Sequence, residues 1–396
     1  MKLLVINQYG PPDGAATAQM LGDLVERAAQ DGAEVTVICS DRSYADPAVR
    51  YPRQEQWKGV DVRRVAITGF GRSGTLGRAV DYVTFLIRAA IAGMRAPKPD
   101  VTLGLSTPPI LGALAVVLAR LRGGRAGYWA MDVYPDVAFA LGALEKTALA
   151  GCVLGAISRW TLRSADVAIA LGECMAERLT AGGARRVATV HNWADERSIT
   201  PTPTSESRLR RARGWGRKFV VLYSGNLGLA HTFDAVLDAA AQLSDANVVF
   251  AFAGTGPRLD EVKTGAARRS LSNVEFLSAV PREDLGDLLA AGDLHLITLR
   301  EGMPGLLVPS KVYGILAAGR PILYVGPAEG EIHGIVNRGC GTALRTEDAD
   351  GVARAVRSYA DDEARRSMEG HAARALFDTA FTRASQTATL LEALSA

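Results

Sequence analysis

Short apolar runs alternate with longer amphipathic stretches along the whole chain. The short runs are rich in Val, Ile, Leu and Ala, which is typical of strands buried on both faces of a sheet. The stretches between them place apolar residues three and four positions apart, which is typical of helices packed on such a sheet. The alternation therefore predicts parallel sheets with helices on both faces.

The predicted elements form two series. In the first half, the predicted strands are Leu3–Asn7, Glu34–Cys39, Val60–Ala66, Val101–Leu105, Ala126–Ala130, Val167–Ala170 and Val187–Val190, and the predicted helices are Thr17–Gln30, Leu76–Met94, Ile110–Leu121, Lys146–Arg163 and Cys174–Ala181. In the second half, the predicted strands are Phe219–Tyr223, Val248–Ala253, Val274–Leu277, Leu294–Leu299, Pro321–Val325 and Gly341–Leu344, and the predicted helices are Thr232–Leu243, Pro257–Arg269, Arg282–Ala290, Ser310–Ala318 and Glu331–Arg338.

The alternation stops near residue 195. The segment PTPTSESRLRRARGWGRK has no apolar periodicity, so we expect a linker or a surface helix there. A chain of 396 residues is too long for one ordinary core. The pattern predicts two Rossmann-like, doubly wound domains, residues 1–195 and 218–380, joined by a linker at residues 196–217. Ligands of such domains bind beyond the carboxyl ends of the strands, so we expect a site in a cleft between the domains.

Composition excludes several classes of protein. Hydrophobic residues make up 48% of the chain and charged residues 22%, which argues against disorder. The net charge of +3 argues against a nucleic-acid binder. The four cysteines lack pair spacing and no His or Cys motif has metal-ligand spacing, so we expect no metal. The longest apolar run, Pro109–Leu121, is too short to span a bilayer, so we expect a cytoplasmic protein, at most peripheral on the inner face of the membrane.

Positive charge gathers in one stretch of the first half. Its cations are Arg63, Arg64, Arg72, Arg78, Arg88, Arg95 and Lys98, against the single acid Asp81. Within it, Tyr82, Phe85, Leu86 and Ile87 are interleaved with arginines, which predicts an amphipathic helix in contact with anionic lipid. The other interpretation is a solvated basic helix face.

Two features of the first half are candidates for the acceptor side of a site. The loop after the first predicted strand contains Gly14, Ala15 and Ala16, which let a ligand approach the backbone, and Thr17, which can cap the next helix. The other interpretation is a tight turn. Asp132 follows a strand in WAMDVYPDV, where a carboxylate can orient or deprotonate an acceptor hydroxyl, and its alternative role is capping.

Two glycine loops of the second half follow strands. In YSGNLG, Gly225 frees the backbone and Asn226 offers an amide, which suits a diphosphate. In AGTGP, Gly254 and Gly256 are candidates to wrap a base or ribose, and a plain turn is the alternative.

The segment REGMPGLLVPSK is the most informative part of the second half. A loop with Glu301 and Gly305 leads to Ser310 and Lys311 at the start of a predicted helix, where a hydroxyl and a positive charge suit a diphosphate. Glu331 begins a later helix, where it can accept hydrogen bonds from ribose hydroxyls or simply favour the helix dipole.

Together these motifs resemble family-4 glycosyltransferases. The blocks that carry the resemblance are HNWADE (His191–Glu196), YSGNLG (Tyr223–Gly228), FAGTGP (Phe252–Pro257) and VPSKVYGILAAGRPIL (Val308–Leu323), in the order and spacing of the family's WbuB-like branch of O-antigen and capsule assembly. The resemblance covers nearly the whole chain. It implies the GT-B fold, a nucleotide sugar, usually UDP-linked, on the C-terminal domain, and transfer with retained anomeric configuration. It also implies that no metal is required and that a C-terminal helix, residues 381–396, crosses back onto the first domain.

The sequence departs from the family at two positions. Most members carry two glutamates eight positions apart, and the second, which contacts the ribose, would stand at Gly314. Glu331 is the candidate substitute. The histidine often found beside the acceptor-domain aspartate would stand at Met131. Asp132 is therefore the remaining candidate for the acceptor-side role.

The expected reaction is the transfer of a hexosyl group (EC 2.4), for example an N-acetylated aminosugar, from a nucleotide diphosphate sugar to a polyprenyl-diphosphate-linked glycan. Lys311, Ser310 and the backbone of Gly225–Gly228 would stabilise the leaving diphosphate. Lys311 and Asp132 are therefore the expected catalytic residues. Two alternatives stay open: a nucleotide-sugar epimerase of the same fold, which needs an acid and base cluster, and a catalytically degenerate partner that only binds nucleotide sugar.

Overall fold

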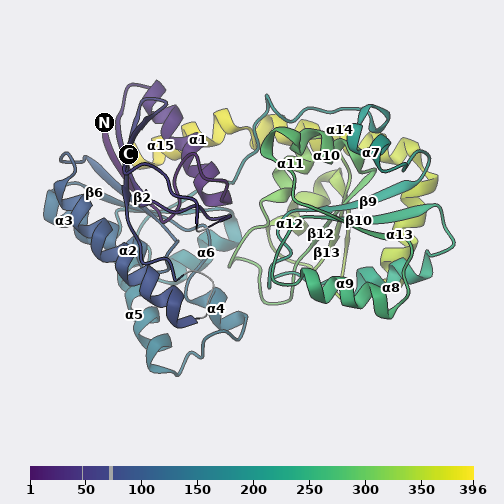
Figure 1. The fold of residues 1–396 in the computed structure, drawn as a ribbon, viewed down its shortest axis with the longest axis horizontal. Coiled ribbons are helices and arrows are strands. Elements are labelled where there is room, and N and C mark those ends of the chain that lie inside the picture. Colours follow the sequence, from purple (N-terminus) through teal and green to yellow (C-terminus); the bar gives the residue numbers. More distant parts are fainter. Residues whose placement is uncertain (47, 71–74) are drawn as a thin grey trace. The chain divides into compact units, whose positions relative to one another are not determined.

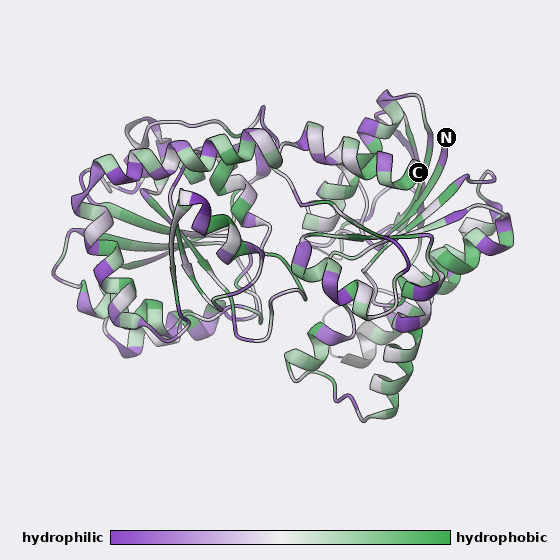
Figure 2. Ribbon diagram, turned by 180° about the vertical axis from the view of Figure 1, so that it is seen from behind, coloured by the Kyte–Doolittle hydropathy of each residue, from purple (hydrophilic) through white to green (hydrophobic). Residues whose placement is uncertain are grey.

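The computed structural model describes residues 1–46, 48–70 and 75–396 (Figure 1). The described chain forms two compact units. The first contains residues 1–191, 305–307 and 384–396, and the second contains residues 192–304 and 308–383. In Figure 2 the strands at the centre of each unit are largely hydrophobic, as expected for sheets buried on both faces.

The first unit is built on an eight-stranded sheet. Its strands are β1 (Lys2–Ile6), β2 (Glu34–Ser40), β3 (Gln54–Trp57), β4 (Val60–Val65), β5 (Val101–Leu105), β6 (Arg125–Trp129), β7 (Val167–Ala170) and β8 (Val187–Thr189), in the order β3-β4-β2-β1-β5-β6-β7-β8. All neighbours are parallel except β3 and β4. The strand order reverses between β1 and β5, where Leu4 pairs with Thr36 on one side and Thr102 on the other.

Helices cover both faces of this sheet. They are α1 (Ala16–Gln30), α2 (Thr75–Arg95), α3 (Leu111–Arg122), α4 (Asp136–Ala140), α5 (Leu149–Ser164), α6 (Glu173–Ala181) and α15 (Arg383–Ser395). On one face, Phe85 of α2 and Leu118 of α3 share a core with Ile6 of β1 and Ile38 of β2. On the other, Leu394 of α15 packs against β6, because a Cβ at Gly127 would lie 2.9 Å from its side chain.

The second unit is built on a six-stranded parallel sheet. Its strands are β9 (Phe219–Ser224), β10 (Val248–Ala253), β11 (Val274–Leu277), β12 (Leu294–Thr298), β13 (Ile322–Val325) and β14 (Gly341–Leu344), in the order β11-β10-β9-β12-β13-β14. This is the Rossmann order 3-2-1-4-5-6, which reverses between β9 and β12. Its helices are α7 (Arg208–Ala212), α8 (Asp234–Gln242), α9 (Leu259–Arg268), α10 (Leu285–Ala291), α11 (Lys311–Ala317), α12 (Glu331–Ile335), α13 (Ala349–Asp361) and α14 (Glu363–Ala380). Both domains therefore have the predicted parallel α/β fold.

Residues 196–217, expected to link the domains, belong to the second unit. They contain α7, and the Arg210 guanidinium is buried, donating to Asp293 at 2.9 Å and to the Ala291 carbonyl. Trp215 is fully buried in the core on the α10 side of the sheet. The segment lacks apolar periodicity because a buried ion pair and one aromatic ring hold it in place.

Candidate functional site

The strand order of the second unit places two loops side by side. They follow β9 and β12, the strands between which the order reverses, and such a point is where open α/β sheets bind ligands. The Arg300 N–H, after β12, donates to the carbonyl of Ala230, after β9, at 2.8 Å. Most residues predicted to bind a donor lie in or next to these two loops.

Lys311 is the residue with the most unusual surroundings there. It begins α11, and its Nζ lies 3.3 Å from the ring centroid of Tyr223 in β9. This Nζ is buried, and within the described part of the chain it has no hydrogen-bond partner. Burial holds the pKa of the ammonium well below its usual 10.5. An anionic ligand would supply the counter-charge that this cation lacks.

The glycines of the two predicted phosphate loops have distinct roles. Gly225 has φ +119, and a Cβ there would lie 3.6 Å from Cε of Lys311. Gly254 has φ +148, and its Cβ would lie 2.0 Å from the Gly225 carbonyl oxygen. A Cβ at Gly256 would lie 2.5 Å from Oδ1 of Asn226. Gly254 and Gly256 thus let the loop after β10 pack directly against the loop after β9.

Some backbone N–H groups of the loop after β9 are used in hydrogen bonds within the protein. The amides of Gly225 and Leu227 donate to the carbonyls of Ala253 and Thr255, each at 2.8 Å. Among the hydrogen bonds of the described residues, none uses the backbone N–H of Asn226. The expectation that the whole segment offers its amides to a phosphate is therefore wrong for Gly225 and Leu227, because the neighbouring loop uses them.

His231 closes this loop as a buried, neutral ring. Its Nδ1 lies 2.6 Å from the Thr298 carbonyl of β12, so this nitrogen carries the proton and donates. Burial, with smaller contributions from Lys311 and Arg258, lowers the pKa of His231 to about 3. The ring is therefore uncharged at neutral pH and ties the ends of β9 and β12 together.

The remaining predicted donor residues lie at the same edge of the second sheet, except Gly305. Glu301 is exposed and accepts a hydrogen bond from Thr346 Oγ1 at 2.7 Å. Ser310 is exposed at the N-cap of α11, where its side chain makes no capping hydrogen bond. Glu331 begins α12, and burial, with a smaller contribution from the Glu331 charge, raises the pKa of the Tyr313 hydroxyl. At Gly314, a Cβ would face the apolar side chains of Leu289 and Ile199 at 3.4 and 3.8 Å.

Gly305 belongs to the first unit, with Leu306 and Leu307. It has φ +72, and a Cβ there would lie 2.8 Å from the Cys174 carbonyl oxygen in α6. The carbonyl of Leu306 accepts a hydrogen bond from the N–H of Val133 at 2.8 Å. Its place in the chain suggested a donor-loop residue, but its contacts hold the segment beside Asp132.

In the first unit, the loops after β1 and β5 adjoin where the strand order reverses. The Gln8 N–H donates to the Thr107 carbonyl at 3.0 Å. Gly14 is exposed, with open space around its Cα, as the approach of a ligand requires. The N-cap of α1 is Ala15, which leaves Ala16 and Thr17 in the first turn.

Thr17 does not cap α1, contrary to expectation. Its hydroxyl accepts instead from Nδ2 of Asn7 at 3.4 Å. Asp13 organises the loop: it accepts from the amides of Ala15 and Tyr44, each at 2.8 Å. Sequence reasoning missed Asp13, although an aspartate two residues before a helix N-cap is a common turn signal.

Asp132 lies one strand further along, in the loop after β6. The amides of Met131 and Asp132 both donate to Oγ of Ser106, each at 3.2 Å, and Ser106 follows β5 directly. Burial raises the pKa of Asp132 from 3.8 to about 6. Asp136, by contrast, begins α4, where it favours the helix dipole. Asp132 thus lies one strand beyond the switch point of the first sheet, with a raised pKa, and Ser106, which sequence reasoning missed, holds its backbone in place.

The charged and polar side chains of the motif HNWADE contact other parts of the protein. The Asp195 carboxylate lies 3.8 Å from the Arg383 guanidinium, and Glu196 accepts from the Arg383 amide at 3.0 Å. His191 Nδ1 lies 3.1 Å from the Leu171 carbonyl.

Within the described residues, no group of three or more His, Cys, Asp or Glu side chains could hold a metal ion. None of the described helices is both long and apolar enough to cross a membrane.

Comparisons with known proteins give the family of each half of the chain. Residues 16–193 match the family "Glycosyl transferase 4-like domain", and residues 205–375 match "Glycosyl transferases group 1". WbjE of Pseudomonas aeruginosa, named as a glycosyltransferase, is 26% identical over 358 residues, which cover 90% of this chain and 88% of that protein. WcaI of Escherichia coli K12, named as a colanic acid biosynthesis glycosyl transferase, is 27% identical over 335 residues, with coverages of 81% and 82%.

Solved structures share the whole fold. HepE of Anabaena, solved with UDP and glucose, matches with a TM-score of 0.77 and 18% identity over 100% of both chains. WaaG, a glycosyltransferase involved in lipopolysaccharide biosynthesis, matches with a TM-score of 0.71 and 17% identity over 100% of this chain and 99% of that one. The chain therefore belongs to the glycosyltransferases of the GT-B fold, with a family-4-like N-terminal domain and a group-1 C-terminal domain.

Proposed function

We propose that this glycosyltransferase moves a hexosyl group (EC 2.4) from a UDP-sugar to a polyprenyl-diphosphate-linked glycan, with retention of anomeric configuration, in the synthesis of a cell-surface polysaccharide. The observation that carries the proposal is the Lys311 ammonium, buried at the switch point of the second sheet without an anion among the described residues. A nucleotide diphosphate is the ligand whose charge and place of binding on such a sheet fit it.

Breaking the bond between the anomeric carbon and the β-phosphate oxygen leaves negative charge on that oxygen. Lys311 is positioned to neutralise this charge, and the backbone N–H of Asn226 can donate to the same diphosphate. Because the site is buried, the attraction between ammonium and phosphate is stronger than it would be in water. We propose that Lys311 takes the place of a metal ion here, so that chelation with EDTA leaves the rate unchanged.

The acceptor hydroxyl loses a proton during transfer. Asp132 has a pKa of about 6 and is mostly ionised at neutral pH, so it can accept a hydrogen bond from that hydroxyl and orient it. The Asp132 amide is fixed by Ser106, which keeps the carboxylate in place. In the resembled family the leaving phosphate receives the acceptor proton on the same face, which is consistent with retention.

The choice of UDP and of a surface polysaccharide rests on the relatives. HepE was solved with UDP, and WcaI and WaaG are named for colanic acid and lipopolysaccharide synthesis. The Tyr313-Gly314 pair resembles the WbuB-like branch. Glu331 is the proposed substitute for the ribose-binding glutamate, because it begins α12, which follows β13 at the carboxyl end of the sheet where the donor would bind.

The epimerase alternative has less support. It needs free acid and base groups, and Asp195 and Glu196 are instead engaged with Arg383. The degenerate-partner alternative predicts nucleotide binding without turnover. Lys311 fits both this alternative and the transferase, so only a measurement of turnover separates them.

The proposed function is tested by a panel of UDP-, GDP-, TDP- and ADP-sugars. We expect thermal stabilisation by UDP-sugars, and release of UDP only when a lipid-linked acceptor is added. Binding without release under any acceptor would favour the degenerate partner. The absence of any shift would contradict the nucleotide site, and inversion at the anomeric carbon, read by NMR of the product, would contradict retention.

A further inference from the structure

Helix α2 of the first unit presents an apolar stripe to solvent. The stripe consists of Val80, Val83, Ile87, Ile91 and Met94, spaced three and four residues apart, and each side chain is 38–57% exposed. This spacing places all five on one helix face, over a length of about 21 Å. We call these five residues the α2 ridge.

The opposite face of α2 already supplies the core. Phe85 and Ala89 are buried beneath the helix, and Leu86 and Ala92 pack against the same cluster. The sequence had suggested Tyr82, Phe85 and Leu86 as lipid contacts, together with Ile87. That is wrong for Phe85, which is fully buried, and Ile87 alone of the four is highly exposed. The ridge is therefore additional apolar surface that folding of this helix does not require.

The neighbouring helices on the same side of the sheet extend this surface. Val117 and Leu121 are 41% and 66% exposed on α3, and the exposed apolar residues of α5 are Leu149, Val153 and Trp160. Together with the ridge, α3 and α5 account for ten of the sixteen large apolar residues that are exposed in the described chain. Exposed apolar residues occur singly on most surfaces, but their concentration on α2, α3 and α5, of which α3 contacts the other two, indicates an interaction site.

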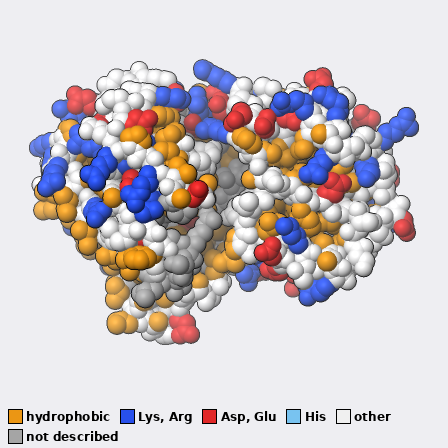
Figure 3. All heavy atoms as spheres, viewed as in Figure 1, with side chains coloured by type: hydrophobic (Ala, Val, Ile, Leu, Met, Phe, Trp, Pro, Cys, Tyr) orange, Lys and Arg blue, Asp and Glu red, His pale blue; other side chains and the backbone are white. Residues whose placement is uncertain are grey.

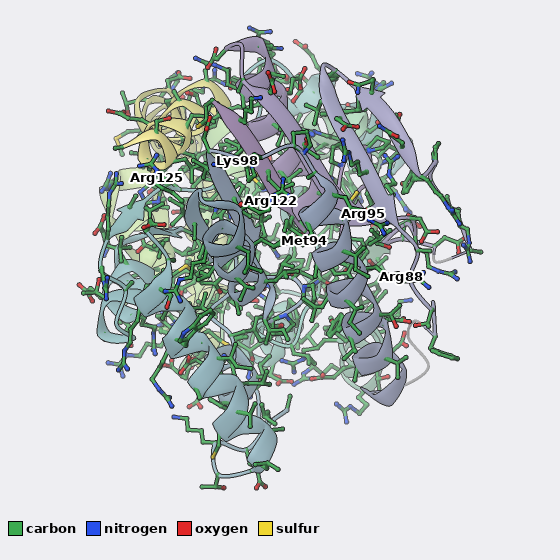
Figure 4. All side chains as sticks on the ribbon, turned by 90° about the vertical axis from the view of Figure 1, so that its left-hand side faces the viewer. Arg88, Met94, Arg95, Lys98, Arg122 and Arg125 are labelled. Atoms are coloured by element: carbon green, nitrogen blue, oxygen red, sulfur yellow. The ribbon has the colours of Figure 1, made fainter. Side chains whose placement is uncertain are left out.

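Between Val80 and Lys98 every exposed charged side chain is basic. Arg88, Arg95 and Lys98 are exposed, and Figure 4 shows Arg95, Lys98 and Arg122 near Met94 at the C-terminal end of α2, with Arg88 further back along the helix. Arg122 also donates to the carbonyl oxygens of Met94 and Ala96, which fixes the end of the helix. In Figure 3, the side of this unit that carries α2 and α3 shows basic and hydrophobic side chains with little acidic surface.

Not every cation of the predicted basic stretch contributes. Arg63 pairs with Asp61 at 2.8 Å, and Arg64 is buried against Glu55 at 2.7 Å. Arg72 and the side chain of Arg78 lie outside the described residues. The stretch's single acid, Asp81, is buried and accepts hydrogen bonds from the Thr68 hydroxyl and the Gly69 and Phe70 amides, so it does not offset the exposed cations.

We propose that the α2 ridge and its basic border bind the surface of an anionic lipid bilayer, with α2 lying in the plane of the interface. Apolar side chains along one helix face, bordered by Arg and Lys, are what interfacial insertion requires. A second copy of the chain fits less well, because the exposed charged side chains described on α2 are all basic, so a two-fold contact through the ridge would offer them no acid of the other α2 to pair with.

The direction of α2 links this surface to the acceptor loops. It runs from the end of β4 to the start of β5, and therefore begins at the sheet edge where Asp132 lies. Bilayer binding would bring that edge near a lipid-linked glycan. The inference itself uses only the surface of the first unit and does not rest on the proposed reaction.

The test is co-sedimentation of the full chain with phosphatidylcholine vesicles that contain or lack phosphatidylglycerol, without donor or acceptor. We expect binding only with the anionic lipid, weakened by salt. Ile87→Asp should lower the partition coefficient about tenfold or more, and Arg95→Gln with Lys98→Gln about thirtyfold. Met368→Asp, at an apolar residue 66% exposed in the second unit, and Arg213→Gln with Arg217→Gln, at exposed arginines of that unit, should bind as wild type.

Equal binding to neutral and anionic vesicles would overturn the proposal, as would an Ile87→Asp variant that binds like wild type. A wild-type dimer that Ile87→Asp converts to monomer would instead assign the ridge to a second copy. Thermal stabilisation by UDP is measured on the same variants. It should be unchanged, which separates loss of the lipid surface from misfolding and from failure of the donor site.

Discussion

At the scale of single residues, Lys311 combines a cost to stability with a benefit to function. Its ammonium is buried over Tyr223 and has no hydrogen-bond partner among the described residues. An unpaired buried charge destabilises a fold until a ligand neutralises it. A residue with a purely structural role would show the reverse, because removing it would weaken the protein.

Lys311→Met removes the charge and keeps most of the volume. We expect kcat/KM to fall about a hundredfold, equivalent to about 3 kcal/mol. We also expect the ligand-free variant to unfold at a higher temperature than wild type, and to gain less from UDP. Lys218→Met, at an exposed lysine of the same unit, is the matched control. Unchanged turnover in Lys311→Met would rule out the phosphate-clamp role.

The lowered pKa of Lys311 also predicts a pH signature. Between that value and 10.5 the unfolded chain binds more protons than the folded one, so the free energy of unfolding rises with pH across this window. Lys311→Met should lack this contribution. A bound diphosphate restores the charge and raises the pKa, so UDP binding should take up protons at pH values above the lowered pKa. Calorimetry in buffers of different ionisation enthalpy measures that uptake.

Ionisation of Asp132 should set the acid limb of the pH profile of kcat/KM. Its pKa is raised by burial to about 6, and it accepts a hydrogen bond from the acceptor only when ionised. We therefore expect kcat/KM to rise with pH and to level off above about 6. Asp132→Asn should lose this limb and about a hundredfold in rate. Asp136→Asn, at the first residue of α4, should keep both. An acid limb that persists in Asp132→Asn would assign it to another group.

At the scale of elements, the site of the second unit depends on two loops that support each other. Gly254→Ala would place a Cβ 2.0 Å from the Gly225 carbonyl oxygen, at a φ of +148. We expect a lower melting temperature and loss of UDP binding, because the loop after β9 would have to move. Gly334→Ala, in α12 with open space around it, should have neither effect. Normal UDP affinity in a folded Gly254→Ala protein would show that the loop contact is dispensable.

Most elements were predictable from the sequence because buried parallel strands are continuous apolar runs. Val101–Leu105, Val167–Ala170 and Val248–Ala253 have the predicted bounds. β3 was missed because QEQW is polar: it is an edge strand, antiparallel to β4, joined by a turn at Lys58 and Gly59 that both have positive φ. The polar pattern of an edge strand carries less information than the apolar pattern of a central one.

The candidate site was predictable in part. Lys311 and Asp132 follow motifs that stand at strand ends, so the sequence offers both as candidates, and their roles stay predictions. Ser106 was missed because its role depends on β5 and β6 being neighbours, which only the strand order reveals. Gly305 was predicted to bind the donor because its sequence neighbours belong to the second domain. Its segment, residues 305–307, belongs to the first unit, where Gly305 packs against Cys174 and Leu306 accepts a hydrogen bond from Val133. Such contacts between distant parts of the chain leave no signal in the local sequence.

At the scale of the whole molecule, the first unit is assembled from distant parts of the chain. Residues 384–396 belong to it: Arg125 of β6 donates to the carbonyls of Leu394 and Ser395, and Leu394 covers Gly127. Removing residues 384–396 should therefore destabilise the first unit and leave the second intact. Hydrogen exchange should show faster exchange in β5 and β6 and no change in β9 and β10. Uniform loosening of both units would contradict this assignment.

That arrangement fixes an order of events during synthesis. Residues 384–396 leave the ribosome only after the whole of the second unit has been made. At about 5–20 residues per second, the first 191 residues wait roughly ten to forty seconds for their last helix. During that interval the face of β6 around Gly127 is open to water and to chaperones. The part of this protein that is made first is the part that finishes folding last.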